Sequence, residues 1–578
     1  MLETTLTTQF IPGTNVKGEV AGANWSFLLP DLELDRTLCV GAPAPATLRT
    51  LTHLSREVII LCRHPRHVQK LCKTGGTGGS AQVYPIVMNA KLKRLPLPSN
   101  IIDLVLIGNA WSAWQTDGAY GLLAEIQRVL KVDGSIYFEF GDPFEPSSTG
   151  REKIYSSQET SFAHQSYWLT PLRGEMQTAV LWQDKQTIDY LIRHNLFSLT
   201  SDFQPLARAE KYIIKRAWSG NFLRRSGALL TREAPDQSGK PPRYLRSAAE
   251  AAGIDLDQSR WALLAMGEYS SRKILFLLFE REETSPKYIF KITRDPAFNF
   301  RLENEYNALS LLWEKGMGDT ERLPQPIFKS RPGGLMLLGE TIIQGSPFRQ
   351  QPKSSPQNPL GRDACAWISK LGKITIDPTN SSPPQVADGL RRLFSRFLEI
   401  YSLTPEQCTF MERQIDSIAQ FQGDFPLVFQ HGDPGTWNML VSPNGKVAFL
   451  DWEAAEPHGI PLWDLFYFMR SYCIWVTRGS GRYESLQVLV QSFLGETPLN
   501  MFVNEMTRSY CQQVGIPAEL IQPLFYTCWM HRALKESTRL PQAKLDHGHY
   551  VNLLRTSIDQ VNAPGLRRLF SDQDPMKL

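Results

Sequence analysis

The amino-acid sequence predicts two folds in one chain, an N-terminal α/β domain with a mostly parallel sheet and a C-terminal α+β region. The first observation is length, because 578 residues exceed what a single hydrophobic core normally supports. The second is a strand at residues 101–107, a helix at 122–131, a glycine turn and a strand at 135–140, which together form one unit of a parallel sheet. The third is the C-terminal part, where strands joined by tight turns precede apolar helices.

Composition describes an ordinary globular protein, with 42% hydrophobic and 21% charged residues. The 62 basic and 58 acidic residues are too balanced to indicate a nucleic-acid partner. Eight scattered cysteines without a Cys-x-x-Cys pair favour reduced thiols, and the polar N-terminal residues 1–9 do not resemble a signal peptide, so we expect a cytoplasmic location. The most apolar long run, residues 460–476, contains Asp464 and Arg470 and predicts a core helix rather than a membrane span.

The most informative motif is His431-Gly432-Asp433, followed by Asn438 and, after one short hairpin, by Asp451. Phosphoryl transfer requires a carboxylate that orients the attacking hydroxyl and accepts its proton, and an amide oxygen and a second carboxylate that hold magnesium on the phosphates. We therefore predict that Asp433 is the catalytic base and that Asn438 and Asp451 are metal ligands. Any one of these residues could be a plain turn residue, but their order between two apolar strands favours the functional interpretation.

This stretch resembles the aminoglycoside phosphotransferase and choline kinase family. Gly432 stands where a protein kinase carries arginine, and Trp452-Glu453 follows Asp451 where Phe-Gly is expected. The resemblance implies a bilobal, protein-kinase-like α+β fold that uses ATP and Mg²⁺. It also implies that His431 props the loop and that Asp464 braces it.

The region upstream supplies the other half of a nucleotide site. A strand, turn and strand over residues 261–279 place Gly267 where a phosphate-covering loop would lie. A lysine, Lys291, then follows inside the apolar strand 288–292; such a lysine is usually solvent-facing, but its place after that loop predicts pairing with phosphate. The resemblance implies that Glu305, on a helix at 300–312, is its partner, with Glu303 as the competing choice.

The resemblance covers residues 245–578. Within this range, residues 335–345 are similar to the hinge that binds adenine in that family. It divides this part into an N-lobe at 245–345 and a C-lobe at 346–578. The preceding stretch, residues 233–244, is rich in proline and polar residues and predicts a linker to the N-terminal domain at 1–232.

The N-terminal domain resembles class I S-adenosylmethionine (SAM)-dependent methyltransferases, whose sheet is doubly wound, because its helix ends in an Arg-Val-Leu-Lys run before a glycine turn. Its cofactor end departs from that family. Pro43 and Pro45 occupy positions expected to be glycine, and proline removes backbone donors. Cys39 and Cys62-Arg63 stand where acidic residues are expected. We predict a degenerate domain to which SAM is unlikely to bind; the alternative is unusual binding in which Asp103 or Asp117 compensates.

The sequence thus predicts an ATP-dependent phosphotransferase that acts on a hydroxyl of a small molecule or a glycan. The helices after Asp464 carry aromatic residues and few acids, which disfavours a polycationic aminoglycoside acceptor. Two alternatives remain, a bifunctional methyltransferase–kinase that modifies a polysaccharide and a pseudoenzyme scaffold. The identity of the acceptor and the oligomeric state are left open by the sequence.

Overall fold

The computed structural model places the chain in two compact units. One, the sheet unit, contains the described residues up to Leu302 together with Ile327–Ile342, and the other, the helical unit, contains Glu303–Pro326 and the described residues from Ile343 onward. The chain passes from one unit to the other within a helix, α9 (Asn299–Glu314). The structure describes residues 23–62, 81–87, 94–107, 119–140, 162–171, 174–194, 196, 225–232, 239–265, 273–352, 357–377, 382–477 and 485–571.

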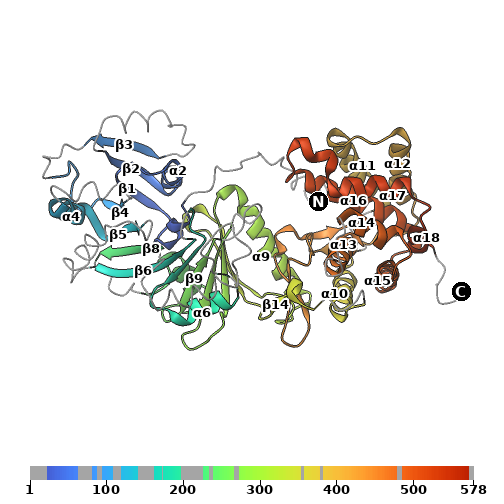
Figure 1. Cartoon of the computed structure of the whole chain (residues 1–578), viewed down its shortest axis with the longest axis horizontal. Helices are drawn as coiled ribbons and strands as arrows, with labels where there is room; N and C mark the ends of the chain where they lie inside the picture. The colour runs from blue at the N-terminus through green and yellow to red at the C-terminus, as the bar shows by residue number, and fades with distance from the viewer. Residues whose placement is uncertain are drawn as a thin grey trace. The chain divides into compact units, whose positions relative to one another are not determined.

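The N-terminal half of the sheet unit is a doubly wound sheet, as the sequence predicts (Figure 1). Its parallel strands lie in the order β3 (Gln82–Val87), β2 (Ser55–Cys62), β1 (Leu34–Val40), β4 (Ile102–Ile107) and β5 (Leu130–Phe140). Three antiparallel strands continue from β5: β8 (Arg225–Arg232), β6 (Phe162–Thr170) and β7 (Thr178–Leu181). The strand order reverses between β1 and β4, and ligands of such sheets bind at the carboxyl ends of the strands at this point.

The parallel strands are apolar nearly throughout because both faces of the sheet are covered. Successive residues of β1 alternate between two hydrophobic cores, one on each face of the sheet. Cys39 belongs to the core that also contains Leu51 of α2 (Pro45–Leu54) and Leu245 of α8 (Arg243–Glu250). Its neighbours Leu38 and Val40 instead pack on the other face, with α4 (Ala119–Val129). This alternation is the period of two that a strand imposes on its side chains.

The helix expected at 122–131 ends earlier, at Val129, and β5 begins at the next residue. The side chain of Arg232 explains the early end, because its Nη1 donates to the carbonyl oxygens of Gln127 (3.0 Å) and Leu130 (2.7 Å) at the helix terminus. The expected glycine turn is an irregularity inside the strand, where the β4–β5 register shifts and Asp133 adopts a φ of 65°.

The sheet does not stop at β7. This strand pairs in antiparallel fashion with β9, so that Ala179 lies opposite Leu263. The continuation makes a single sheet of thirteen strands. The added strands lie in the order β9 (Arg260–Leu264), β10 (Lys273–Phe279), β11 (Tyr288–Thr293), β13 (Leu337–Thr341) and β12 (Pro326–Ser330). The methyltransferase-like region and the region predicted as a nucleotide-binding lobe therefore belong to one unit.

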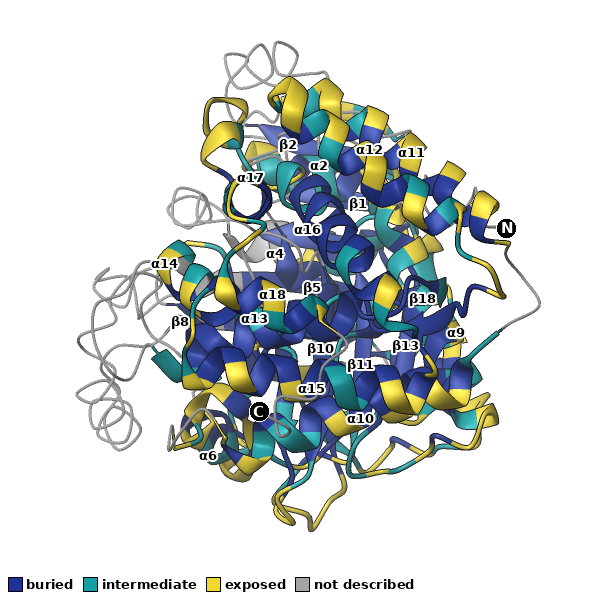
Figure 2. Ribbon diagram, turned by 90° about the vertical axis from the view of Figure 1, so that its right-hand side faces the viewer, coloured by how far each residue is buried: buried dark blue, intermediate teal, exposed yellow. Residues whose placement is uncertain are grey.

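Helices dominate the helical unit, and proline stands in the first turn of α10, α11, α12 and α15, where it costs no hydrogen bond. The central helix, α16, buries nearly every residue from 521 to 534, whereas α11 and α12 expose one face (Figure 2). Among the described residues, no helix is long and apolar enough to cross a membrane. The main helices are α10 (Pro359–Thr375), α11 (Pro383–Ile400), α12 (Pro405–Ala419), α13 (Trp463–Thr477), α15 (Pro498–Val514), α16 (Ile521–Ser537) and α17 (His549–Asp559).

Candidate active site

The loop that carries the predicted base lies between two short strands of the helical unit, β15 (Val428–Gln430) and β16 (Met439–Val441). Asp433 is half-buried, and its Oδ2 accepts hydrogen bonds from Asn438 Nδ2 (3.1 Å) and Trp437 Nε1 (3.3 Å). Its Oδ1 accepts no hydrogen bond in the described part of the chain. One carboxylate oxygen is thus held in place, and the other is available to a reacting hydroxyl.

His431 connects the loop to the residue before Asp451. Its Nε2 lies 2.9 Å from the carbonyl oxygen of Leu450, and its Nδ1 accepts the backbone N–H of Asp433 at 3.3 Å. Both contacts are satisfied by a neutral ring that carries its proton on Nε2. The imidazole has no nitrogen left over for proton transfer, and it positions the backbone of Asp433.

Gly432 is required by the shape of the loop. Its φ is 78°, and a Cβ added there would lie 1.9 Å from the carbonyl oxygen of Ala454. The carboxylate of Asp464 accepts the backbone N–H groups of His431 (2.6 Å) and Gly432 (3.2 Å), and Arg532 Nη1 donates to the carbonyl oxygen of Gly432 (2.8 Å). Burial raises the pKa of Asp464, and the nearby Arg532 guanidinium opposes this shift. Sequence reasoning missed Arg532, which lies 100 residues from the glycine that it contacts.

A hairpin brings Asn438 and Asp451 to the same place. Strand β16 pairs with β17 (Val447–Phe449), and the Leu450 N–H donates to the carbonyl oxygen of Asn438 at 2.9 Å. The amide nitrogen of Asn438 is bonded to Asp433, which leaves its amide oxygen available as a ligand. Asp451 itself adopts a left-handed conformation with a φ of 67°, which is uncommon outside glycine and is found at functional sites.

One amide oxygen and one carboxylate suit Mg²⁺, which usually takes one or two protein ligands and completes its shell with phosphate oxygens and water. A self-sufficient metal site is a different arrangement, and no group of three or more His, Cys, Asp or Glu side chains suited to a metal occurs among the described residues. Asn438 and Asp451 could hold such an ion together with the phosphates of a nucleotide.

Glu305 belongs to the helical unit and is fully buried there. One of its carboxylate oxygens accepts the backbone N–H of Trp452 at 3.2 Å. The neighbouring Asn304 donates to the carbonyl oxygens of Glu453 (3.1 Å) and Ala455 (2.9 Å). Helix α9 is thereby tied to the segment that directly follows Asp451, whereas Glu303, the competing choice, is half-buried.

Lys291 lies in the sheet unit, on β11, with only 6% of its surface exposed. Its Nζ forms an ion pair with Oε1 of Glu340, a buried residue of β13. Sequence reasoning placed Glu340 near the hinge but missed this role, although a carboxylate inside an otherwise apolar strand was a signal. The pairing of Lys291 with Glu305 stays a prediction, and Gly267 lies outside the described residues.

At the predicted cofactor end of the N-terminal sheet, the described loop after β1 offers few backbone donors. Gly41 follows β1 with a φ of 92°, and its N–H donates to the carbonyl oxygen of Leu61 at 3.0 Å. Helix α2 begins at Pro45, so neither this residue nor Pro43 offers an N–H to a ligand. Burial raises the pKa of the Cys39 thiol to about 12, so this residue carries no charge at neutral pH.

Asp103 does not stand at that end. It lies at the start of β4, where its carboxylate accepts Lys131 Nζ (2.8 Å) and the backbone N–H groups of Asp35 (3.0 Å) and Arg36 (2.8 Å). Asp103 therefore cannot replace a missing cofactor ligand at the carboxyl ends. The other residue considered for this role, Asp117, lies outside the described residues.

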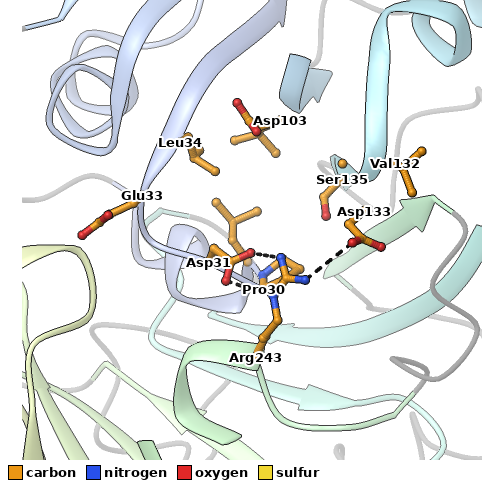
Figure 3. Close-up of a pocket in the computed structure, with 12 residues that line it drawn as sticks. Pro30, Asp31, Glu33, Leu34, Asp103, Val132, Asp133, Ser135 and Arg243 are labelled. Atoms are coloured by element: carbon orange, nitrogen blue, oxygen red, sulfur yellow. Dashed lines mark hydrogen bonds and ion pairs between the residues drawn. The ribbon is translucent and has the colours of Figure 1, made fainter. Parts of the chain in front are cut away.

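A cavity of about 230 Å³ opens beside Asp103, at the amino ends of β1 and β4 (Figure 3). Arg243 reaches into it, where it forms an ion pair with Asp31 and lies 3.8 Å from Asp133. Ligands of doubly wound sheets bind at the opposite, carboxyl ends of the strands. This cavity is therefore not the cofactor pocket that the fold leads one to expect.

Two family models match the chain. The model described as phosphotransferase enzyme family matches residues 271–483, and the model described as methyltransferase domain matches residues 38–138. No curated protein matches the chain. The chain thus carries an N-terminal methyltransferase domain and a C-terminal domain of the phosphotransferase family.

Three solved structures are among those to which parts of this chain are similar. A SAM-dependent methyltransferase from Aquifex aeolicus is 17% identical, and the match covers 22% of this chain and 69% of that chain with a TM-score of 0.19. A thermostable mutant of aminoglycoside phosphotransferase APH(4)-Ia, in complex with ADP and hygromycin B, is 11% identical over 55% of this chain and 96% of that chain, with a TM-score of 0.33. WbdD, in complex with a kinase inhibitor, is 11% identical over 84% of each chain, with a TM-score of 0.21. At these TM-scores none of the three fixes a function for this chain.

Proposed function

We propose that this chain transfers the γ-phosphoryl group of ATP to a hydroxyl of a small molecule or a glycan. The hydrogen bonding of the Asp433 carboxylate carries the proposal. Its Oδ2 accepts two hydrogen bonds, and its Oδ1 accepts none among the described residues. The match of residues 271–483 to the phosphotransferase family supports the same conclusion.

In the proposed reaction, the acceptor hydroxyl donates a hydrogen bond to Asp433 Oδ1. Its oxygen attacks the γ-phosphorus, its proton passes to Asp433, and the bond from the γ-phosphorus to the bridging oxygen of ADP breaks. Magnesium, when bound by Asn438 and Asp451, would neutralise charge on the phosphates. Asn438 also orients the base through its amide nitrogen, so one residue couples the metal position to the base.

The role of Lys291 gives the first test of this proposal. Replacing Lys291 with Ala should weaken MgATP binding by about 10- to 100-fold, because a charged hydrogen bond to phosphate contributes about 1.5–3 kcal/mol. The measurement is a thermal shift titrated with MgATP. Lys287→Ala is the matched control, because this lysine precedes the same strand, pairs with Glu280 and is half exposed.

Loss of Lys291 also leaves the buried Glu340 without this ion-pair partner, which alone could destabilise the fold. A double variant that adds Glu340→Gln removes the buried charge and separates the two effects. ATP affinity equal to that of the wild type in the folded double variant would show that Lys291 does not bind the nucleotide.

We propose further that the methyltransferase domain does not bind SAM. Pro43 and Pro45 remove donors from the loop after β1, and the Gly41 N–H is engaged with Leu61. Isothermal titration of the full chain with SAM should give no saturable binding at micromolar concentrations. The variant that carries both Pro43→Gly and Pro45→Gly restores two backbone donors and is the matched comparison.

The competing function is a bifunctional methyltransferase–kinase that modifies a polysaccharide. The match of residues 38–138 to the methyltransferase domain model is the observation in its favour. Micromolar binding of SAM to the wild-type chain would decide for this alternative and against a degenerate domain.

A further inference from the structure

Trp437 is the residue of the catalytic loop whose position the proposed chemistry does not yet explain. Its side chain is 38% exposed, whereas the other large aromatic residues around it, including Tyr467 and Trp475, are almost fully buried. An isolated exposed tryptophan is unremarkable on a protein surface, so exposure alone decides nothing. What matters is its place, because its indole Nε1 donates a hydrogen bond directly to the predicted base, Asp433.

The indole ring is held by Arg349, by Tyr467 and by Gly435, where an added Cβ would lie 2.2 Å from Cζ2 of the ring. The guanidinium of Arg349 lies 5.0 Å from the ring centroid, within the range of a cation–π interaction. Arg349 is itself fixed, since its Nε donates to Thr436 Oγ1 (3.2 Å) and its carbonyl oxygen accepts Trp475 Nε1 (3.2 Å). Tyr467 meets the indole edge-on, with ring centroids 6.0 Å apart and planes at 83°. A flat ring thus lies in a fixed orientation beside Asp433 with part of its surface open.

We propose that Trp437 is the platform on which the phosphate acceptor stacks, and that this acceptor is a sugar ring. The inference rests on the proposed phosphotransferase function and narrows its acceptor class. A pyranose presents a face of C–H groups that packs against an aromatic ring, while its hydroxyls point outward from the edge. A ring stacked on Trp437 brings an edge hydroxyl toward Asp433 Oδ1, because the Nε1 hydrogen bond ties the platform to the opposite oxygen of the same carboxylate.

The charge around the platform selects among sugars. Trp437 has Arg349 against its ring, and among the described residues the carboxylate that it contacts is that of the proposed base, Asp433. An aminoglycoside would bring ammonium groups toward the Arg349 guanidinium, and like charges at short range repel. The platform therefore fits a sugar without ammonium groups, either neutral or acidic.

The test uses the full-length protein with MgATP and a defined set of acceptors. The ring acceptors are the methyl glycosides of glucose, galactose, mannose and glucuronic acid; glycerol and choline are acceptors without a sugar ring, and hygromycin B is the aminoglycoside. Binding is measured by saturation-transfer NMR, and phosphorylation by ADP release. We expect at least one glycoside to bind and to be phosphorylated in preference to glycerol, choline and hygromycin B.

Three substitutions separate stacking from a structural role. Trp437→Ala should raise the glycoside KM by about tenfold, the scale of a lost stacking contact, with a much smaller change in kcat. Trp437→Phe keeps the flat face and removes the N–H, so it should retain the KM and alter kcat through Asp433. Phe300→Ala is the control, because this exposed ring lies on α9 in the sheet unit and should leave both constants unchanged.

The inference is overturned if Trp437→Ala leaves the glycoside KM unchanged, if only glycerol, choline or hygromycin B is phosphorylated, or if no glycoside of the set binds. Failure of the proposed phosphotransferase function would give a different experimental result. A wild-type chain that neither binds MgATP nor hydrolyses it slowly to water would refute the phosphotransferase itself. Asp433-dependent ATP hydrolysis without binding of any glycoside would refute the sugar platform alone.

Discussion

Asp433→Asn should lower turnover by about 10²–10⁴-fold, the usual loss for a positioned base, while the affinity for MgATP stays nearly unchanged. The two hydrogen bonds to Asp433 Oδ2 fix how the substituted side chain will be oriented, so the effect on turnover can be interpreted directly. Asn438 Nδ2 and Trp437 Nε1 both donate to Oδ2, so the new amide will turn its oxygen toward them. Its NH₂ group then replaces Oδ1, and a donor stands where the acceptor hydroxyl must lose its proton. Slow ATP hydrolysis to water provides the readout before any acceptor is known.

Asp451→Asn is the matched comparison for that experiment. It removes a predicted magnesium ligand, so nucleotide affinity should fall together with turnover. The two variants have the same change in charge and size and differ only in the assigned role. Equal losses of MgATP affinity in both would mean that Asp433 has been given the wrong role.

The parts of this site that could be predicted from the sequence are local. Asp433, Asn438 and Asp451 fall within nineteen consecutive residues, and one hairpin determines how they meet. Short-range turn chemistry and strand pattern were enough to predict that these segments meet, and the roles of the three residues stay predictions. Gly432 was noted from the sequence only as a difference from protein kinases, and its φ of 78° in the tight turn is a finding of the structure.

The contacts that could not be predicted join distant segments. Arg532 reaches Gly432 from a helix 100 residues away, and Glu340 reaches Lys291 through the pairing of β11 with β13. Strand register between distant segments depends on packing across the whole sheet, which a local pattern does not encode. The early end of α4 is similar, because Arg232 that caps it lies about a hundred residues downstream.

The pairing of β7 with β9 was also not predicted, and it makes the N-terminal strands part of the same sheet as β9 to β13. Residues from both halves pack in common cores: Trp168 and Val180 lie in one cluster with Ala262 and Phe279. Without the first half, β9 would be an edge strand with its apolar side chains uncovered, and such an edge pairs with other chains. The methyltransferase-like half thus stabilises strands β9 and β10, whether or not it performs chemistry.

A chain that begins at Gly239 should therefore aggregate or fail to bind MgATP.

A sharper experiment keeps the full chain and replaces Ala179, which is buried in β7 opposite Leu263, with proline. Proline inside a sheet removes a ladder hydrogen bond. The buried carbonyl oxygen that loses its donor should cost about 1–3 kcal/mol of unfolding free energy. Arg281→Pro is the control, because Arg281 is exposed in the turn closed by the Glu283 N–H and the Glu280 carbonyl, where proline is tolerated. Calorimetry should show Ala179→Pro lowering the transition that MgATP stabilises, and a soluble 239–578 chain with full MgATP affinity would contradict this structural role.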